Sequence, residues 1–157
     1  MKRLNLPLDG ACRCGRVKIR ISAPPMLTMA CHCTGCQRMS GSAYSLSAAI
    51  PTEGFAVIAG APVVAGANAE AGHHFCPDCM TWMFTRPAGF DFFVNVRPTL
   101  LDETGWYSPF IETYTSEKLA WAQTPAEHSY EKYPPMEDYE KLIGAYAASA
   151  AWAVAVK

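Results

Sequence analysis

The chain has seven cysteines in three short groups, and this distribution constrains the fold more than any other feature of the sequence. The groups are Cys12 and Cys14, then Cys31, Cys33 and Cys36, and finally Cys76 and Cys79. An odd number of thiols leaves at least one outside any set of disulfides within the chain. Spacings of one or two residues between thiols are instead typical of zinc ligands. The sequence therefore predicts metal binding.

The seven thiols divide naturally into four and three, although their spacing alone does not settle the division. Joining Cys12 and Cys14 to Cys76 and Cys79 gives a closed zinc site and closes a loop of about 60 residues, at a cost of about 3–4 kcal/mol. Structural zinc sites supply about 10–16 kcal/mol, so the metal outweighs the loop entropy. We expect this site to be structural, with Gly15 allowing the backbone to bend.

Cys31, Cys33 and Cys36 then provide three ligands to a second zinc ion. Catalytic zinc sites use three protein ligands and keep one position for water or substrate. Three thiolates give such a site a net charge of about −1 and favour another soft ligand. We therefore expect a small-molecule thiol in the fourth position, and we expect Gly35 to give the backbone of this group its freedom.

Other interpretations remain open at this point. One treats all seven cysteines as reduced core residues without ligands, and another treats a C-x-x-C pair as a redox site, although no thioredoxin-like βαβ pattern surrounds it. A third closes both zinc sites, with the second completed by a distant acidic residue or by His32, His73 or His74. Because His32 stands between two cysteines, we expect its side chain to point away from them.

Short alternating segments separated by Gly and Pro predict a single, mainly-β domain of several small antiparallel sheets held together by zinc. The clearest strand is 16–22, where Val17, Ile19 and Ile21 alternate with basic residues. Further strands are expected at 43–50, 55–60, 73–76, 82–86, 90–96 and 111–116, with 73–76 and 82–86 as a hairpin. In 90–96 the residues expected on one face are Phe90, Phe92, Val94 and Val96. Short helices are expected at 34–39 and 97–102.

From Met136 onward the pattern becomes that of a helix. Two prolines precede a pair of acidic residues, which is a typical helix start. Apolar side chains then recur at helical spacing, at Tyr139, Leu142, Ile143, Tyr146, Ala147 and Ala150. We therefore divide the chain into a zinc-binding β domain at 1–135 and an amphipathic helix at 136–157. The helix is expected to pack on this domain, and a homodimer interface is the alternative.

The composition excludes several classes of protein. Half of the residues are hydrophobic and 17% are charged, which indicates a globular chain. The formal net charge of −1 comes without a basic cluster, so we expect no nucleic-acid partner. The first residues lack the apolar run of a secretory signal, and the longest apolar run is too short to cross a membrane. We expect a cytoplasmic protein, since a reducing compartment keeps thiols available for metal.

The residues after the second cysteine group are candidates for substrate binding. Arg38 offers a forked donor that either balances an anionic metal site or binds a substrate carboxylate. Ser40 and Gly41 begin a small polar turn whose backbone N–H groups are able to face a substrate. A solvent-exposed arginine and an ordinary connecting turn are the simpler interpretations.

At this point the sequence resembles the glutathione-dependent formaldehyde-activating enzyme family. The resemblance is carried by Gly10–Ile21, Cys31–Tyr44 and His73–Phe84, and more loosely by Thr99–Asp102 and Ile111–Trp121. All three cysteine groups are therefore included, in order. A lone C-x-x-C would not be specific, but the combination of three groups is.

The resemblance implies a tent-like β fold, a structural zinc at the first and third cysteine groups, and a second zinc at the middle group where glutathione enters. The implied activity is the joining of glutathione to formaldehyde, formally that of a carbon–sulfur lyase. The sequence departs from the family where Met80 replaces a common Gly and where Gln37 stands between Cys36 and Arg38. The alternative to an enzyme is a non-catalytic zinc module that binds a thiol metabolite or a protein, or a structural protein with both zinc sites closed.

Overall fold

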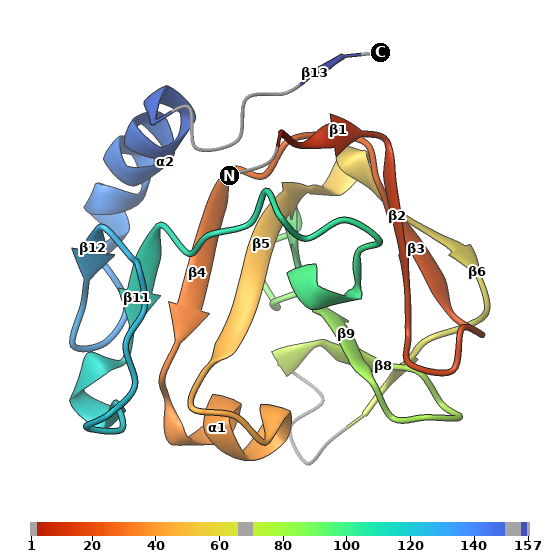
Figure 1. The fold of residues 1–157 in the computed structure, drawn as a ribbon, viewed down its shortest axis with the longest axis horizontal. Coiled ribbons are helices and arrows are strands. Elements are labelled where there is room, and N and C mark those ends of the chain that lie inside the picture. Colours follow the sequence, from red (N-terminus) through yellow and green to blue (C-terminus); the bar gives the residue numbers. More distant parts are fainter. Residues whose placement is uncertain (1–2, 66–70, 150–154, 157) are drawn as a thin grey trace.

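The structure of the protein is a computed structural model that describes residues 3–65, 71–149 and 155–156 (Figure 1). Its largest sheet has eight strands in the order β12 (His128–Ser129), β11 (Ile111–Thr113), β4 (Leu27–Cys31), β5 (Ser45–Pro51), β10 (Phe93–Val96), β9 (Trp82–Thr85), β8 (His73–Phe75) and β7 (Val63–Val64). A second sheet joins β2 (Leu8–Ala11), β3 (Lys18–Ile21) and β6 (Phe55–Ala59). The prediction of a mainly-β fold with several sheets is confirmed.

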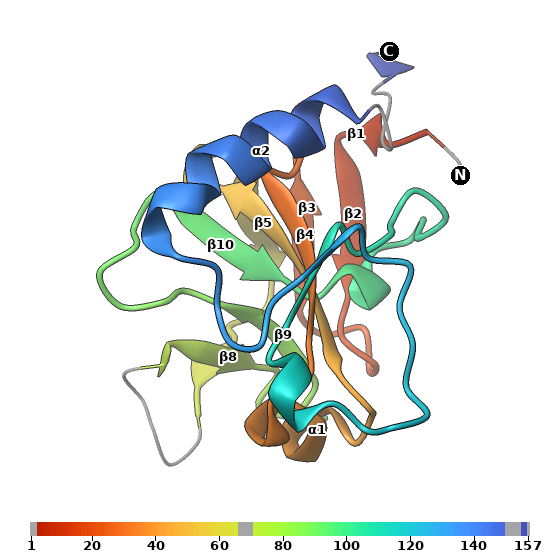
Figure 2. The same ribbon diagram turned by 90° about the vertical axis from the view of Figure 1, so that its left-hand side faces the viewer.

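The remaining elements are short. One parallel pair joins β1 (Asn5–Leu6) to β13 (Ala155–Val156). The α-helices are α1 (Thr34–Ser40) and α2 (Tyr139–Ala148), and single turns of 3-10 helix form η1 (Thr52–Gly54), η3 (Pro98–Leu100), η4 (Thr115–Glu117) and η5 (Met136–Asp138). Helices α1 and α2 lie at opposite ends of the large sheet in both views (Figures 1 and 2). The short helices expected at 34–39 and 97–102 are present as α1 and η3.

Alternation along the sequence predicts most of the strands correctly. In β3 and just before it, Val17, Ile19 and Ile21 are buried while the basic residues between them face solvent. The expected hairpin is the antiparallel pair β8–β9, and the expected strands at 43–50 and 55–60 are β5 and β6. Strand β4 was not predicted, because a strand in the interior of a sheet is buried on both faces and does not alternate.

Two predicted strands are shorter than expected. Phe90 and Phe92 are 38% and 58% exposed and lie in the turn before β10, so the prediction that they share a face with Val94 and Val96 is wrong. A hydrogen bond from Phe90 N to the carbonyl of residue 87 closes this turn and interrupts the extended backbone. Similarly, β11 ends at residue 113 because Tyr114 has a left-handed backbone with φ of 57°.

The main hydrophobic core joins the two larger sheets. Its buried side chains come from β3, β5, β6, β9 and β10, and the largest is Trp106, whose indole N–H donates to the carbonyl of Glu103 at 2.9 Å. A second cluster lies under α2, where Leu142 and Tyr146 pack with Leu27, Phe110 and Ile111. Figure 2 shows α2 lying across the sheet on the side of β4. The described part of the predicted C-terminal helix therefore buries an apolar face, although Ala147 is exposed and Ala150 lies outside the described residues. The prediction that this helix spans 136–157 is wrong, because α2 ends at Ala148 and Ala155–Val156 pair with β1 as strand β13.

Glu112 is a buried acidic residue that ties β11 to its neighbours. Its carboxylate accepts hydrogen bonds from Lys118 at 2.9 and 3.1 Å, from Thr124 and Ser129 at 2.8 Å, and lies 3.0 Å from Nε2 of His32. Burial acts to raise the pKa of this carboxyl, but the bonds from Lys118, Ser129 and Thr124 outweigh burial and lower its pKa to about 2. The network holds β11 against β4 at the point where Cys31 and His32 leave the sheet.

We expect the Glu112→Gln substitution to lower the free energy of unfolding by about 3 kcal/mol at pH 7. The pKa of the folded carboxyl lies below the ordinary value of 4.5, so its contribution is complete above about pH 5 and is lost as the pH falls toward about 2. Urea unfolding at several pH values measures this difference. The exposed Glu127→Gln substitution is the control, and equal pH profiles for the two variants would contradict the expectation.

Candidate metal centre

The first and third cysteine groups meet at one point of the structure. The Sγ atoms of Cys12, Cys14, Cys76 and Cys79 all lie within 4.8 Å of one another. The Cys12–Cys14 distance is 3.5 Å and the Cys14–Cys76 distance is 3.8 Å. Metal–sulfur bonds of about 2.3 Å in a tetrahedron place sulfurs about 3.8 Å apart, so the four thiols have the spacing of a closed metal site.

Local backbone features bring each pair of thiols together. Gly15 has a left-handed backbone with φ of 77°, and its N–H donates to the carbonyl of Cys12. The chain therefore turns just after Cys14, as expected from the sequence. In the third group Met80 N bonds to the carbonyl of Cys76 and Thr81 contacts the sulfur of Cys79 at 3.1 Å. The Thr81 hydroxyl is the main reason that the pKa of Cys79 is lowered to about 5.

The middle cysteine group forms a separate cluster where β4 runs into α1. Cys31 ends β4, Cys33 is the N-cap of α1, and Cys36 lies in its first turns, so their three Sγ atoms lie within 4.8 Å of one another. The Cys36 N–H donates to the sulfur of Cys33 at 3.3 Å, in the way that an N-cap hydroxyl accepts from a helix. Gly35 lies within α1 and does not have a positive φ, so the expectation that the backbone bends there because of glycine is wrong. The chain bends instead at Cys33, the N-cap of the helix.

Hydrogen bonding within this triplet favours an anionic sulfur. The Cys36 thiol is the main reason that the pKa of Cys31 is lowered to about 5, against the opposite effect of burial. The pKa of Cys36 is raised correspondingly, because its proton is shared with Cys31 and its sulfur is buried. One thiolate already present near neutral pH is a suitable starting point for metal binding, which requires deprotonated sulfur.

No histidine or carboxylate of the described residues joins the triplet within ligand distance. The His32 side chain points away from the triplet, as its position between two cysteines predicts. It is fully buried rather than at the surface, and its Nε2 lies next to the Glu112 carboxylate. Its ring also packs edge-on against Tyr44 at 5.2 Å. His73 contacts the Thr85 hydroxyl at 2.9 Å, and His74 bonds to a backbone carbonyl. The three histidines are thus occupied with other contacts.

The predicted substrate-binding residues follow the triplet along α1 and the turn after it. Arg38 is exposed in the last turn of α1 and bonds to no described residue. The Ser40 hydroxyl donates to the carbonyl of Cys36 at 2.7 Å and so closes the helix. Gly41, with φ of 60°, is the C-cap and lines an open groove of about 470 Å³. The other residues that line this groove are Ser42, Ala43, Tyr44, Leu119 and Trp121.

The structure also identifies supporting residues that the sequence did not. Gln37 donates from its side-chain amide to the carbonyl of His32 at 2.6 Å and to that of Glu117 at 3.0 Å. The Glu117 carboxylate in turn accepts from the N–H and the hydroxyl of Thr34. The triplet loop is therefore fastened to η4, about 80 residues later in the chain. Gln37 was visible in the sequence only as a departure from a family pattern.

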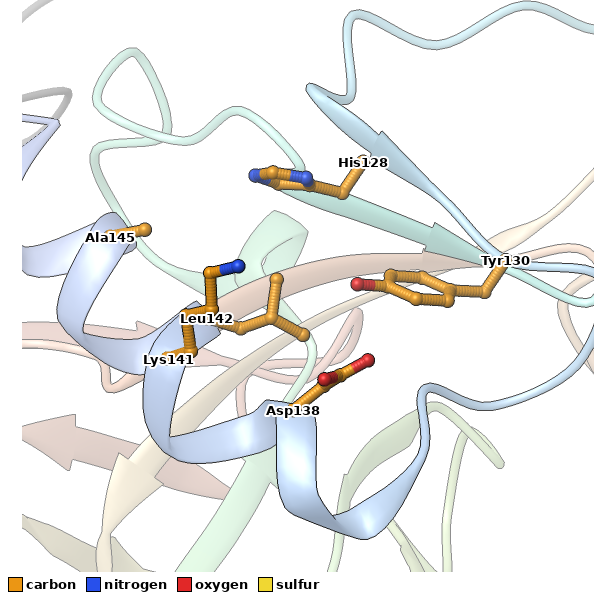
Figure 3. A pocket seen from close by; sticks show the side chains of 6 residues that line it. All are labelled: His128, Tyr130, Asp138, Lys141, Leu142 and Ala145. Atoms are coloured by element: carbon orange, nitrogen blue, oxygen red, sulfur yellow. The ribbon is translucent and has the colours of Figure 1, made fainter.

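A second, smaller pocket of about 110 Å³ lies between α2 and β12 (Figure 3). It is lined by His128, Tyr130, Asp138, Lys141, Leu142 and Ala145. The pocket contains no thiol and none of the site residues predicted from the sequence. Because α2 and α1 lie at opposite ends of the sheet, this pocket is separate from the cysteine triplet (Figure 1).

Comparison with known proteins agrees with the arrangement of the cysteines. Residues 7–117 match the model of the glutathione-dependent formaldehyde-activating enzyme family, and the chain belongs to this family. Two fungal proteins, each named "Putative glutathione-dependent formaldehyde-activating enzyme", are similar to it. The Penicillium rubens protein is 28% identical over 124 residues, and the Talaromyces marneffei protein is 26% identical over 113 residues.

The alignments cover 74% and 67% of this chain but only 63% and 59% of those two relatives, so the chain spans less than two thirds of their length. A crystal structure of a Rhodobacter sphaeroides protein aligns with 60% of this chain and 87% of its own, with a TM-score of 0.48 and 21% identity. In the part of the chain that the structure describes, no helix has the length and apolar character needed to cross a membrane.

Met80 provides a test of the turn that follows Cys79. Its φ of 56° is left-handed, which costs a residue with a Cβ about 1–2 kcal/mol, and its side chain is 58% exposed. We expect Met80→Gly to raise the free energy of unfolding by about 0.5–1 kcal/mol, since glycine adopts this conformation freely but loses more entropy on folding. Met80→Ala keeps the Cβ and is the control. Equal gains for both variants in urea unfolding would assign the effect to the lost side chain instead.

Proposed function

We propose that this protein is a zinc-dependent enzyme of the carbon–sulfur lyase type that acts on the adduct of a thiol and an aldehyde, with glutathione and formaldehyde as the first candidates. The observation that carries the proposal is the cysteine triplet, which offers three sulfur ligands and is joined by no fourth ligand among the described residues. Catalytic zinc sites keep such a position for substrate. Membership of the glutathione-dependent family supports a thiol in that position.

The two clusters take different roles in this proposal. Zinc at Cys12, Cys14, Cys76 and Cys79 is structural, because four sulfurs complete its coordination and connect β2 to the turn between β8 and β9. Zinc at Cys31, Cys33 and Cys36 would hold a thiol cosubstrate as the nucleophilic thiolate. The described spacing of both sets of sulfur atoms fits these roles. Residues 1–135 would then form the zinc-binding unit, with helix α2 packed on it.

The chain's own residues would position the reactants. The thiolate sulfur adds to the aldehyde carbon, a carbon–sulfur bond forms, and the carbonyl oxygen takes up a proton from solvent. Arg38 is exposed beside the triplet and would bind a carboxylate of the thiol compound. The groove that begins at Gly41 would hold the rest of that molecule, with Ser40 fixing the turn. Holding both reactants in one orientation supplies much of the expected acceleration.

The cytoplasm is the compartment that suits this proposal, because a reducing environment keeps glutathione and all seven cysteines as thiols. The competing proposal is a non-catalytic zinc module that binds a thiol metabolite or a protein partner. The groove and Arg38 serve binding equally well without turnover. The two proposals therefore differ in whether bound thiol and aldehyde react faster than they do in solution.

The division of the metals predicts different behaviour for two matched cysteine variants. We expect two zinc ions per chain in the natural protein and one in each variant. Cys76→Ser should unfold the protein or lower its stability by several kcal/mol, because the closed site connects distant segments. Cys36→Ser should leave the thermal unfolding midpoint within a few degrees of the natural value. Elemental analysis and calorimetry measure both quantities, and one zinc ion in the natural protein would contradict the division.

The activity itself is tested by the rate of S-hydroxymethylglutathione formation, compared with the uncatalysed rate at the same pH. We expect the natural protein to accelerate the reaction, Cys36→Ser to abolish the acceleration, and Arg38→Ala to raise KM for glutathione by about threefold to tenfold with little change in kcat. Met80→Gly is a control outside the site. Glutathione binding without any acceleration, for formaldehyde and related aldehydes alike, would support the non-catalytic alternative.

A further inference from the structure

Arg97 is a half-buried cation that forms no ion pair with a described acidic residue. Its Nη1 donates to the carbonyl of Leu46 at 2.9 Å, and its guanidinium carbon lies 3.8 Å from the ring centroid of Trp82. The Nη2 contact with Thr85 is long, at 3.5 Å, and the buried Nε has no hydrogen-bond acceptor among the described residues. Burial lowers the pKa of this guanidinium to about 10, so it remains charged at neutral pH.

A buried cation is costly unless a negative charge lies close to it. None of the ion pairs between described residues includes Arg97, which distinguishes it from Arg16 and Arg20 with their aspartate partners. The tyrosines whose charge would act on Arg97 do not supply it. Tyr107 and Tyr133 are held in the neutral form because burial raises the pKa of each phenol, and His73 is an imidazole that carries no negative charge.

The carbonyl that holds Arg97 lies close in the sheet to the cysteine triplet. Leu46, whose carbonyl holds the guanidinium, follows Ser45, and Ser45 is the residue of β5 that pairs with Cys31 at the end of β4. Thiolate charge at Cys36 or Cys31, which metal binding requires, would stabilise the protonated form of Arg97 against the larger, opposite effect of burial. Arg97 is thus held next to the strand ends that carry Ser45 and Cys31, with its Nε buried, whereas Arg38 is exposed on α1.

Three thiolates around a divalent ion carry a net negative charge, which is complementary to a half-buried cation that has no acidic partner among the described residues. We infer that Arg97 is the positioning residue that balances the charge of the metal-bound sulfurs of Cys31, Cys33 and Cys36. This inference rests on the metal site of the proposed function and concerns no substrate. The sequence suggested Arg38 for this charge-balancing role, and the inference assigns it to Arg97 instead. Arg38 then remains available to contact a ligand from solvent.

Zinc retention without any thiol or aldehyde tests this inference apart from the reaction. The zinc-loaded full chain is titrated with a colorimetric zinc chelator, and the two ions are resolved by their affinities. In Arg97→Gln the triplet zinc should be released at about tenfold lower chelator concentration, because a nearby unit charge is lost from a site of low dielectric constant. Arg97→Lys, which keeps the charge, should restore most of the affinity. The four-cysteine zinc should be unchanged in both variants.

The matched control is Arg86→Gln, since Arg86 lies 5.5 and 5.9 Å from the rings of Phe55 and Phe84 and is exposed. A merely structural role for Arg97 would lower the thermal midpoint and leave the affinity of the triplet zinc unchanged. That result, or an equal loss of zinc affinity in Arg97→Gln and Arg97→Lys, would overturn the inference. Inactivity toward glutathione and formaldehyde, with the expected zinc affinities, would instead overturn the proposed function and leave the inference standing.

Discussion

Thiols from separate parts of the chain lie within a few ångströms of one another in this protein, and their close approach depends on how negative charge is shared between them. Four sulfurs meet in one cluster and three in the other. If several ionise, they repel one another at these distances unless a cation is shared between them. Protons play this part when no metal is bound, as the opposite pKa shifts of Cys31 and Cys36 illustrate. A metal ion neutralises the sulfurs more strongly than protons do, and it also connects the chain segments that carry them.

The large sheet sets the position of the triplet. Cys31 is the last residue of β4, which lies between β5 and β11, and the chain passes directly from this strand into α1. Its neighbours are fixed by polar contacts: Glu112 accepts from three side chains beside β11, and Gln37 fastens α1 to η4. These contacts hold the loop that carries the three sulfurs against the sheet, and the groove lined by Gly41 and Trp121 begins where α1 ends.

Two arginines near the triplet differ in their exposure to solvent. Arg38 is on the solvent side of α1, where an ion pair with a ligand is worth little by itself but can orient it. Arg97 is half-buried, without an acidic partner among the described residues. We infer that the charge of Arg97 adjusts the metal site and propose that the charge of Arg38 meets the substrate. In such a site, Arg97 would affect how tightly the metal is bound, and Arg38 would affect how tightly the thiol compound is bound.

The sequence by itself determined the three cysteine groups, the alternating strands such as β3, and the short helix after Cys33, because these depend on spacing and periodicity over a few residues. It missed β4, which lies within the sheet and is buried on both faces, and it extended β10 to Phe90 because aromatic residues in a turn imitate alternation. The tertiary structure brought the first and third groups together in one cluster. Only the tertiary structure decided that His32 faces Glu112 and that Arg97 bonds to the carbonyl of Leu46, next to the residue that pairs with Cys31. Residues brought together from more than 60 positions apart leave no local pattern, since their contact is set by strand order and register.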